Sequence, residues 1–356
     1  MSLKISSICL KFSPALLFLL FFQFSQAQGS KKLVKELGVA EYSALNDVVQ
    51  RNAKALGNDA SVLLWTDTLV YKKELGSFDS KTLVPLESAS KWLTAALVLK
   101  LAEEGKISLD DKVSQYLPVF ESYGKTYITI RHCLTHFTGI QMDGGGIFSK
   151  KKYGSLEDEV EAYAKREIQT NPGTEFRYTQ AGFAIAGRIL EVVSKKKFDM
   201  LIKQKLFNPL GMRKSTFSKL DGSAIDPSSG GQSTADEFMN FLQMLLNNGT
   251  FKGQAFLSEA SVAELKKISA ASSAIKTPVK GAEGLGYAAG SWVLDEKGSG
   301  EAGAVASPGM PGVLPLVDWC RGYALLVLPK SDVELRKDLL LQFKAAADEK
   351  RPSKCK

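Results

Sequence analysis

The sequence predicts an α+β protein in which an antiparallel sheet, flanked by N- and C-terminal helices, carries an inserted all-α domain. Two observations predict this class. Strand-like segments gather at the two ends of the chain, whereas helical patterns separated by Gly and Pro occupy the middle. In addition, 356 residues of which 44% are hydrophobic can bury a large core. We expect residues 28–87 and 276–356 to form the α/β domain and residues 88–275 the mainly helical domain.

The N-terminal part of the α/β domain begins with a predicted helix. Apolar residues recur at helical spacing over residues 39–56. Two β-rich segments follow, "SVLLWTD" at 61–67 and "TLVYKKELG" at 68–76, with a tight turn predicted at Asp67–Thr68. The next segment, residues 86–106, is strongly apolar and predicts the longest helix of this half of the chain.

Further helices and a second group of strands complete the pattern. Helices are predicted at 129–136, 156–168, 181–194, 198–205, 234–247 and 258–267. Strands are predicted at 286–294, 312–318 and 322–329, with a final helix within 331–349. We therefore expect strands from both ends of the chain to share one sheet.

The first 27 residues have the features of a secretory signal. Two lysines precede the apolar run "PALLFLLFF", and Ser25-Gln26-Ala27 offers small residues for cleavage. The run is shorter than the roughly 20 residues that span a bilayer, which favours cleavage over an uncleaved anchor. We expect an exported protein, periplasmic or secreted, with no stable membrane span after cleavage.

Charge and cysteine content narrow the classes of partner. The net charge of +8 is dispersed, and no basic run is interleaved with aromatic residues, so nucleic-acid binding is not predicted. Three cysteines follow the signal, at positions 133, 320 and 355. An odd number cannot form a complete disulfide framework, so the thiols are expected to be buried or incidental, and a single Cys320–Cys355 bridge is the alternative in an exported chain.

Several familiar chemistries lack their residues. The two histidines, His132 and His136, lie four apart in "ITIRHCLTHFTG" without the glutamate and third ligand of a zinc site, so no metal is predicted and both are expected to be structural. The G-x-S-x-G nucleophile motif does not occur. No Gly-rich phosphate loop or dinucleotide-binding fingerprint opens a helix, so no cofactor is predicted.

The remaining candidate chemistry is a serine nucleophile that a nearby lysine activates. The S-x-x-K spacing recurs along the chain, for example at Ser88–Lys91, Ser122–Lys125, Ser194–Lys197 and Ser273–Lys276. Only Ser88 stands at the head of a strongly apolar helix, where residues three apart share a face and free N–H groups favour a developing anion. Such a lysine can take the serine proton and make the hydroxyl nucleophilic. The structural alternative is that Ser88 caps the helix and Lys91 extends to solvent.

A tyrosine favours the catalytic interpretation. Tyr178 lies in "NPGTEFRYTQAGFAIAGRILEVVS", between a Pro-Gly turn and the predicted helix 181–194. A side chain at such a junction can project into a cleft and relay a proton beside a cation. Alone it would be an ordinary half-buried tyrosine, but together with Ser88 and Lys91 it predicts a catalytic group.

Together these segments resemble the serine β-lactamase and penicillin-binding protein superfamily, in particular its class C-like branch of esterases and D-aminopeptidases. The likeness spans roughly residues 60–330 and includes "LESASKWLTAALVLKLAEEGK", "ITIRHCLTHFTGI", "FRYTQAGFAIAGRILE" and "GLGYAAGSWV". It implies a β-lactamase/transpeptidase-like fold with the active site between the two domains. It also implies Ser88 as nucleophile and half of the oxyanion hole, Lys91 as proton acceptor and Tyr178 as partner base.

Two positions depart from the family's pattern. Its Y-x-N motif is Tyr178-Thr179-Gln180 here, and its third motif, K-T-G or H-x-G, is Ser307-Pro308-Gly309. The resemblance implies that Gln180, Ser307 and Gly309 bind substrate and that the N–H of Met310 completes the oxyanion hole. Ser307 supplies no charge for a substrate carboxylate, which favours an esterase-like or amidase-like acyl hydrolase over β-lactam hydrolysis or carboxypeptidation.

The prediction is an exported, cofactor-independent serine hydrolase that cleaves an ester or amide, or a D-amino-acid peptide of the cell wall, through a Ser88 acyl-enzyme. Its expected partner is a small-molecule or cell-wall peptide substrate. The alternatives are a catalytically weak penicillin-binding-like module that binds or is slowly acylated, and a true β-lactamase.

Overall fold

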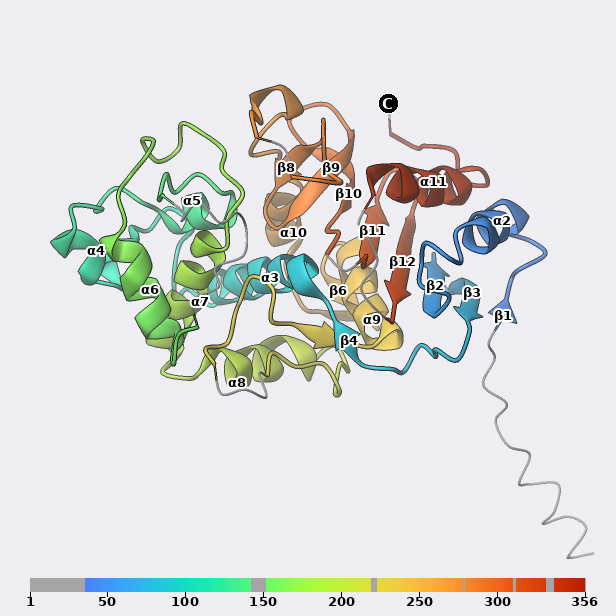
Figure 1. Ribbon diagram of the computed structural model, residues 1–356, viewed down its shortest axis with the longest axis horizontal. Helices are drawn as coiled ribbons and strands as arrows, with labels where there is room; N and C mark the ends of the chain where they lie inside the picture. Colours follow the sequence, from blue (N-terminus) through green and yellow to red (C-terminus); the bar gives the residue numbers. More distant parts are fainter. Residues whose placement is uncertain are drawn as a thin grey trace, which may run out of the picture. The chain divides into compact units, whose positions relative to one another are not determined.

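The chain forms a mixed helix and sheet structure built on one antiparallel sheet, as seen in a computed structural model that describes residues 36–141, 152–218, 223–277, 279–309, 312–330 and 336–355. The proposed signal, residues 1–27, and Met310 lie outside these residues. The sheet has eight strands in the order β1-β3-β2-β12-β11-β10-β9-β8 (Figure 1). They are β1 Glu36–Leu37, β2 Ala60–Trp65, β3 Leu69–Leu75, β8 Gly286–Ala288, β9 Ser291–Glu296, β10 Ala302–Ala306, β11 Leu314–Asp318 and β12 Tyr323–Pro329.

The two ends of the chain meet where β2 pairs with β12. Leu63 lies opposite Leu326 in this antiparallel ladder. Because side chains alternate along a strand, Leu63 faces the helical part, whereas Val62 and Leu64 face the opposite layer. That layer consists of α2 (Ser43–Arg51) and α11 (Lys337–Asp348), which lie together on one side of the sheet (Figure 1).

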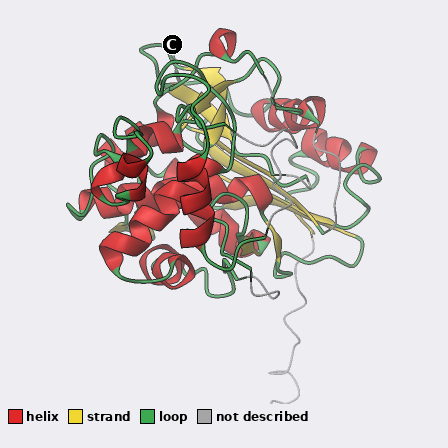
Figure 2. Cartoon of the chain, turned by 60° about the vertical axis from the view of Figure 1, so that its left-hand side comes forward, coloured by secondary structure: helices red, strands yellow, loops and turns green. Residues whose placement is uncertain are grey.

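The other face of the sheet packs against the helical part (Figure 2). Its helices are α3 Ser90–Glu103, α4 Val119–Ser122, α5 Ile130–Leu134, α6 Leu156–Lys165, α7 Ala181–Ser194, α8 Phe198–Ile202, α9 Ala235–Leu246 and α10 Glu259–Lys266. Two short ladders join its loops, β4 Val84–Pro85 with β5 Gln232–Ser233, and β6 Thr250–Phe251 with β7 Gln254–Ala255. No helix within the described ranges is both long and apolar enough to cross a bilayer.

The predicted fold class is confirmed, and most predicted elements are present. The helix predicted at 181–194 has those bounds, and Gly105, with φ of +67°, ends the turn after α3 as a glycine at this position should. Two predictions need correction. Residues 286–294 form a hairpin of β8 and β9 that turns at Gly290. The sequence does not predict β10, because "AGAVA" has one β-branched residue, Val305, among alanines and a glycine, which are depleted in strands.

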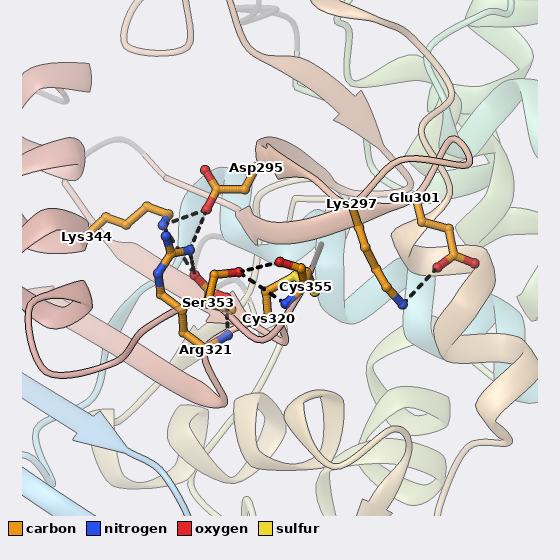
Figure 3. Close-up of a disulfide and its surroundings, with 9 residues drawn as sticks. Asp295, Lys297, Glu301, Cys320, Arg321, Lys344, Ser353 and Cys355 are labelled. Atoms are coloured by element: carbon orange, nitrogen blue, oxygen red, sulfur yellow. Dashed lines mark hydrogen bonds and ion pairs between the residues drawn. A yellow bond between two sulfur atoms is a disulfide. The ribbon is translucent and has the colours of Figure 1, made fainter.

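A disulfide joins the C-terminal segment to the turn between β11 and β12 (Figure 3). Cys320 and Cys355 are bonded with a Cα–Cα separation of 5.1 Å, whereas Cys133 is a buried free thiol. The bridge lies beside an ionic cluster in which the buried Lys344 contacts the carboxylates of Asp295 and Asp318. The bridge compatible with the sequence is therefore formed, and it holds the segment after α11 against the sheet.

Removing the bridge with Cys320→Ser and Cys355→Ser is expected to lower the free energy of unfolding by about 2–4 kcal/mol, since it closes a loop of 35 residues in the unfolded chain. Denaturant titration followed by tryptophan fluorescence measures the change. Dithiothreitol should move the native midpoint to that of the double variant and leave the variant unaffected. Equal midpoints for the oxidised native chain and the variant would contradict a stabilising role.

Candidate active site

Ser88 lies in a single 3₁₀ turn, Glu87–Ala89, that leads directly into α3. The preceding residue, Glu87, has φ of +46°, a conformation that is uncommon for residues other than glycine and occurs frequently at functional sites. The N–H of Leu86 donates to the carbonyl of Gly231 at 2.8 Å, which fixes the entrance to the turn. The half-buried Ser88 is thus held at the head of a helix whose first eleven residues include ten that are buried.

Lys91 is brought to Ser88 by the first turn of α3. Its side chain is buried, with 1% of the residue exposed, and Nζ lies 3.5 Å from Ser88 Oγ. Nζ donates to the carbonyl of Ser228 at 3.1 Å. Lys91 therefore does not extend to solvent, and the structural alternative for this serine and lysine pair does not apply.

The turn around Ser228 is fixed by two further polar residues of α3. Gly231 N–H donates to Ser90 Oγ at 2.9 Å, and Thr94 Oγ1 donates to the carbonyl of Pro227 at 2.6 Å. Ser90 is fully buried and its oxygen is an acceptor here, so it is a support rather than a second nucleophile. Ser228 is the partner of Lys91 that sequence reasoning missed, because a backbone carbonyl 137 residues away leaves no residue-type signal.

Tyr178 lies on the other side of the lysine. Lys91 Nζ is 4.9 Å from the centroid of the Tyr178 ring, within the range of a cation–π contact. Gln180, two residues later, is 8% exposed, and its side chain has no hydrogen-bond partner among the residues that the structure describes. The structure thus brings Ser88, Lys91 and Tyr178 together and leaves the Gln180 amide available to a ligand.

The segment Ser307-Pro308-Gly309 approaches the turn that carries Ser88 through its glycine and not through its serine. A Cβ added to Gly309 would lie 2.2 Å from the carbonyl oxygen of Leu86 and 3.3 Å from the nitrogen of Ala89, so Gly309 touches the turn that carries Ser88. Ser307 is 3% exposed, and its hydroxyl donates to the carbonyl of Gly290 at 2.8 Å. Its donor is thus engaged within the protein, and no charged group occupies this motif position.

The hydrogen bond from Ser307 supports the turn between β8 and β9 at Gly290. Gly290 has φ of +83°, and an added Cβ would lie 3.0 Å from the carbonyl oxygen of Lys91 and from Trp92 Cα. The β8–β9 turn therefore packs directly on the backbone of α3. Ser307 stabilises the backbone beside Lys91, a role that the sequence pattern could not distinguish from substrate contact.

The two histidines lie in different surroundings. His132 is half-buried and accepts the N–H of Thr129 at 3.3 Å, which completes the N-terminal cap of α5. His136 is 1% exposed and packs among Phe176, Tyr178, Phe183 and Tyr287. Within the described part of the chain no cluster of three or more His, Cys, Asp or Glu residues could hold a metal ion.

Comparison with known proteins identifies the family of the chain. The sequence model of the Beta-lactamase family matches residues 51–347. Among curated proteins, Protein flp of Staphylococcus aureus (strain MW2) is 32% identical over 141 residues, which are 38% of this chain and 28% of that protein. The chain therefore aligns with less than a third of the length of this relative.

Solved structures share the fold. EstCE1, a hydrolase with promiscuous acyltransferase activity, superposes with a TM-score of 0.71 and 19% identity over 86% of this chain and 99% of its own. The octameric penicillin-binding protein homologue from Pyrococcus abyssi gives a TM-score of 0.68 and 22% identity over 89% and 80% of the two chains. Since the family model covers most of the sequence and the serine and lysine stand together at the head of α3, the chain belongs to the Beta-lactamase family.

Proposed function

We propose that the protein is an exported serine hydrolase that cleaves an ester or amide through an acyl-enzyme on Ser88. The observation that carries the proposal is the placement of Lys91 Nζ, buried and 3.5 Å from Ser88 Oγ, beside the ring of Tyr178. Burial of a lysine against a serine hydroxyl serves proton transfer more readily than stability, since an uncompensated buried ammonium is costly.

The reaction follows from these positions. Ser88 Oγ attacks the acyl carbon while its proton passes to Lys91, or through it to Tyr178. The N–H of Ser88 stabilises the tetrahedral oxyanion, and the family resemblance implies that the N–H of Met310 does so too. The C–O or C–N bond of the substrate then breaks, the leaving group takes the proton, and a water deprotonated by the same groups releases the acid from Ser88.

The class of substrate is an ester or amide without a required carboxylate. The supporting observation is Ser307, whose hydroxyl is engaged by Gly290 and which supplies no cation for a substrate carboxylate. The side-chain amide of Gln180, a residue that is 8% exposed, has no partner among the described residues and suits an acyl-group carbonyl or N–H. We rank esters and amides first as substrates, D-amino-acid peptides second and β-lactams third, and we place the protein in the class C-like branch of the family.

Export rests on two features. The segment 1–27 has the composition of a secretory signal, and the Cys320–Cys355 disulfide is typical of proteins that fold in an oxidising compartment. Both favour a periplasmic or secreted protein.

The second candidate function is a penicillin-binding-like module that is acylated without turnover. It is favoured by the replacement of the family's cationic third motif by Ser307 and of its asparagine by Gln180. The two functions differ in deacylation, so a stable adduct with every substrate supports the module and multiple turnovers support the hydrolase.

The test uses an activated acyl ester, a penicillin and a fluorophosphonate, with intact mass and turnover recorded for the native chain and Ser88→Ala. Ser122→Ala is the matched control, because Ser122 also precedes a lysine by three but is exposed on α4. We expect an adduct of one acyl group on the native chain and Ser122→Ala, and none on Ser88→Ala. Labelling that persists in Ser88→Ala, or a native chain inert to all three reagents, would falsify the assignment.

A further inference from the structure

Both neighbours of Tyr178 in the chain hydrogen-bond to a single residue, His136. The N–H of Arg177 donates to the His136 carbonyl at 2.8 Å, and the N–H of Thr179 donates to His136 Nδ1 at 3.3 Å. Between these two bonds the imidazole packs on the Tyr178 ring with a centroid separation of 4.5 Å. One side chain and its own carbonyl thus hold the backbone on each side of the tyrosine and its ring.

The hydrogen bonds define the tautomer of this histidine. Because Nδ1 accepts from the Thr179 N–H, the ring proton is on Nε2, which donates to Tyr287 Oη at 3.0 Å. Tyr287 is itself buried in the wall of β8 and packs on the Tyr178 ring. Two hydrogen bonds with opposite directions therefore fix the orientation of the imidazole.

The surroundings keep His136 neutral, as that arrangement requires. The ionisable groups that face it are Lys91 from α3, Tyr178 from the turn before α7 and Tyr287 from β8. Burial, reinforced by the positive charge of Lys91, holds the pKa of His136 well below its usual value of 6.5. Burial and the proximity of Tyr178 raise the pKa of Tyr287 well above 10, so its hydroxyl stays protonated.

The backbone of His136 indicates that this placement has a cost. Its φ is +61°, in the left-handed region that is uncommon for residues other than glycine and asparagine. His132, one turn earlier, makes only the local cap of α5. A histidine needed only for packing would not require an unfavourable backbone together with hydrogen bonds to both chain neighbours of Tyr178 and a ring contact with Tyr178 itself.

We propose that His136, supported by Tyr287, is a positioning residue that sets the location of the Tyr178 ring relative to Lys91 and thereby the rate of Ser88 acylation. The inference deepens the proposed function and rests on it. His136 does not touch the reacting atoms, and it acts through Tyr178.

The kinetic test compares His136→Ala with His136→Asn. Asparagine tolerates positive φ, and its Oδ1 can accept the Thr179 N–H near the place of Nδ1. We expect His136→Ala to lower kcat on an activated ester about 100-fold or more, as expected for a misplaced catalytic group, with KM changed less than threefold. The kcat of His136→Asn should be at least tenfold higher than that of His136→Ala. Tyr287→Phe, which keeps the ring, should lower kcat by about three- to tenfold relative to the native chain.

The control is His132→Asn, the same substitution at the histidine within α5, four residues before His136, which should leave kcat within twofold. The inference would be overturned by an undiminished kcat in His136→Ala, or by equal kcat values in His136→Ala and His136→Asn. In either case the proposed function would stand as long as Ser88→Ala abolishes turnover. If His136→Ala does not fold, an undiminished kcat in Tyr287→Phe together with an inactive His136→Asn overturns it.

A second measurement does not depend on activity. Crystal structures of the native chain, His136→Asn and His136→Ala give the distance between Lys91 Nζ and the Tyr178 ring centroid, 4.9 Å here. We expect His136→Asn to retain it and His136→Ala to increase it. An unchanged distance in His136→Ala would overturn the positioning role even if no substrate were found.

Discussion

Lys91→Met is expected to lower the rate of Ser88 acylation by about 10²- to 10⁴-fold without lowering the free energy of unfolding. The first effect is the size of a general-base contribution, since Lys91 Nζ is the amine 3.5 Å from Ser88 Oγ. The second follows from burial. Nζ contacts a carbonyl and a hydroxyl rather than a carboxylate, so an apolar side chain of similar length removes a buried polar group without leaving a charged partner unpaired.

The measurement pairs the rate of adduct formation with a fluorophosphonate and the midpoint of thermal unfolding. Lys125→Met is the matched control, because Lys125 is also buried and also follows a serine by three, with its Nζ bonded to the carbonyl of Tyr123. It should leave acylation unchanged. Equal acylation by Lys91→Met and the native chain would exclude Lys91 as the base, and a large loss of stability would assign it a structural role.

The sequence was most informative where one segment contains all the partners of an interaction. Ser88 and Lys91 lie in one helical turn, so their spacing and the apolar residues that follow predict both the helix and the proximity of the two side chains. The helix after Tyr178 was also predicted with its observed bounds, because its apolar pattern is long and uninterrupted.

Long-range contacts through backbone atoms could not be predicted in this way. The Ser228 carbonyl that accepts from Lys91, and the Gly290 carbonyl that accepts from Ser307, are available in any residue type. A serine in the third motif therefore predicted a ligand contact, whereas the structure gives it an internal acceptor. The sequence predicts a structural role for His136. Its hydrogen bonds to both neighbours of Tyr178 come from a segment 41 to 43 residues later in the chain, and the local sequence does not specify that this segment packs against His136.

Gly309→Ala is expected to lower kcat about 100-fold and the free energy of unfolding by about 1–3 kcal/mol. The added Cβ would lie 2.2 Å from the Leu86 carbonyl oxygen, closer than two such atoms can approach. Leu86 cannot yield freely, because its N–H is bonded to Gly231 and Ser88 follows two residues later. The clash must therefore separate the segment after β10 from the Ser88 turn, and a displacement of about 1 Å at a nucleophile costs that much in rate.

Steady-state kinetics on an activated ester and denaturant titration measure the two effects. Gly154→Ala is the matched control, since an added Cβ there has ordinary contact only, 3.7 Å from Asp158 Oδ2, at a position without positive φ. The control should keep native rate and stability. Because Gly309 presents no side chain, its effect isolates the backbone approach from any chemistry of Ser307, and native kinetics in Gly309→Ala would show that the third motif does not shape the Ser88 turn.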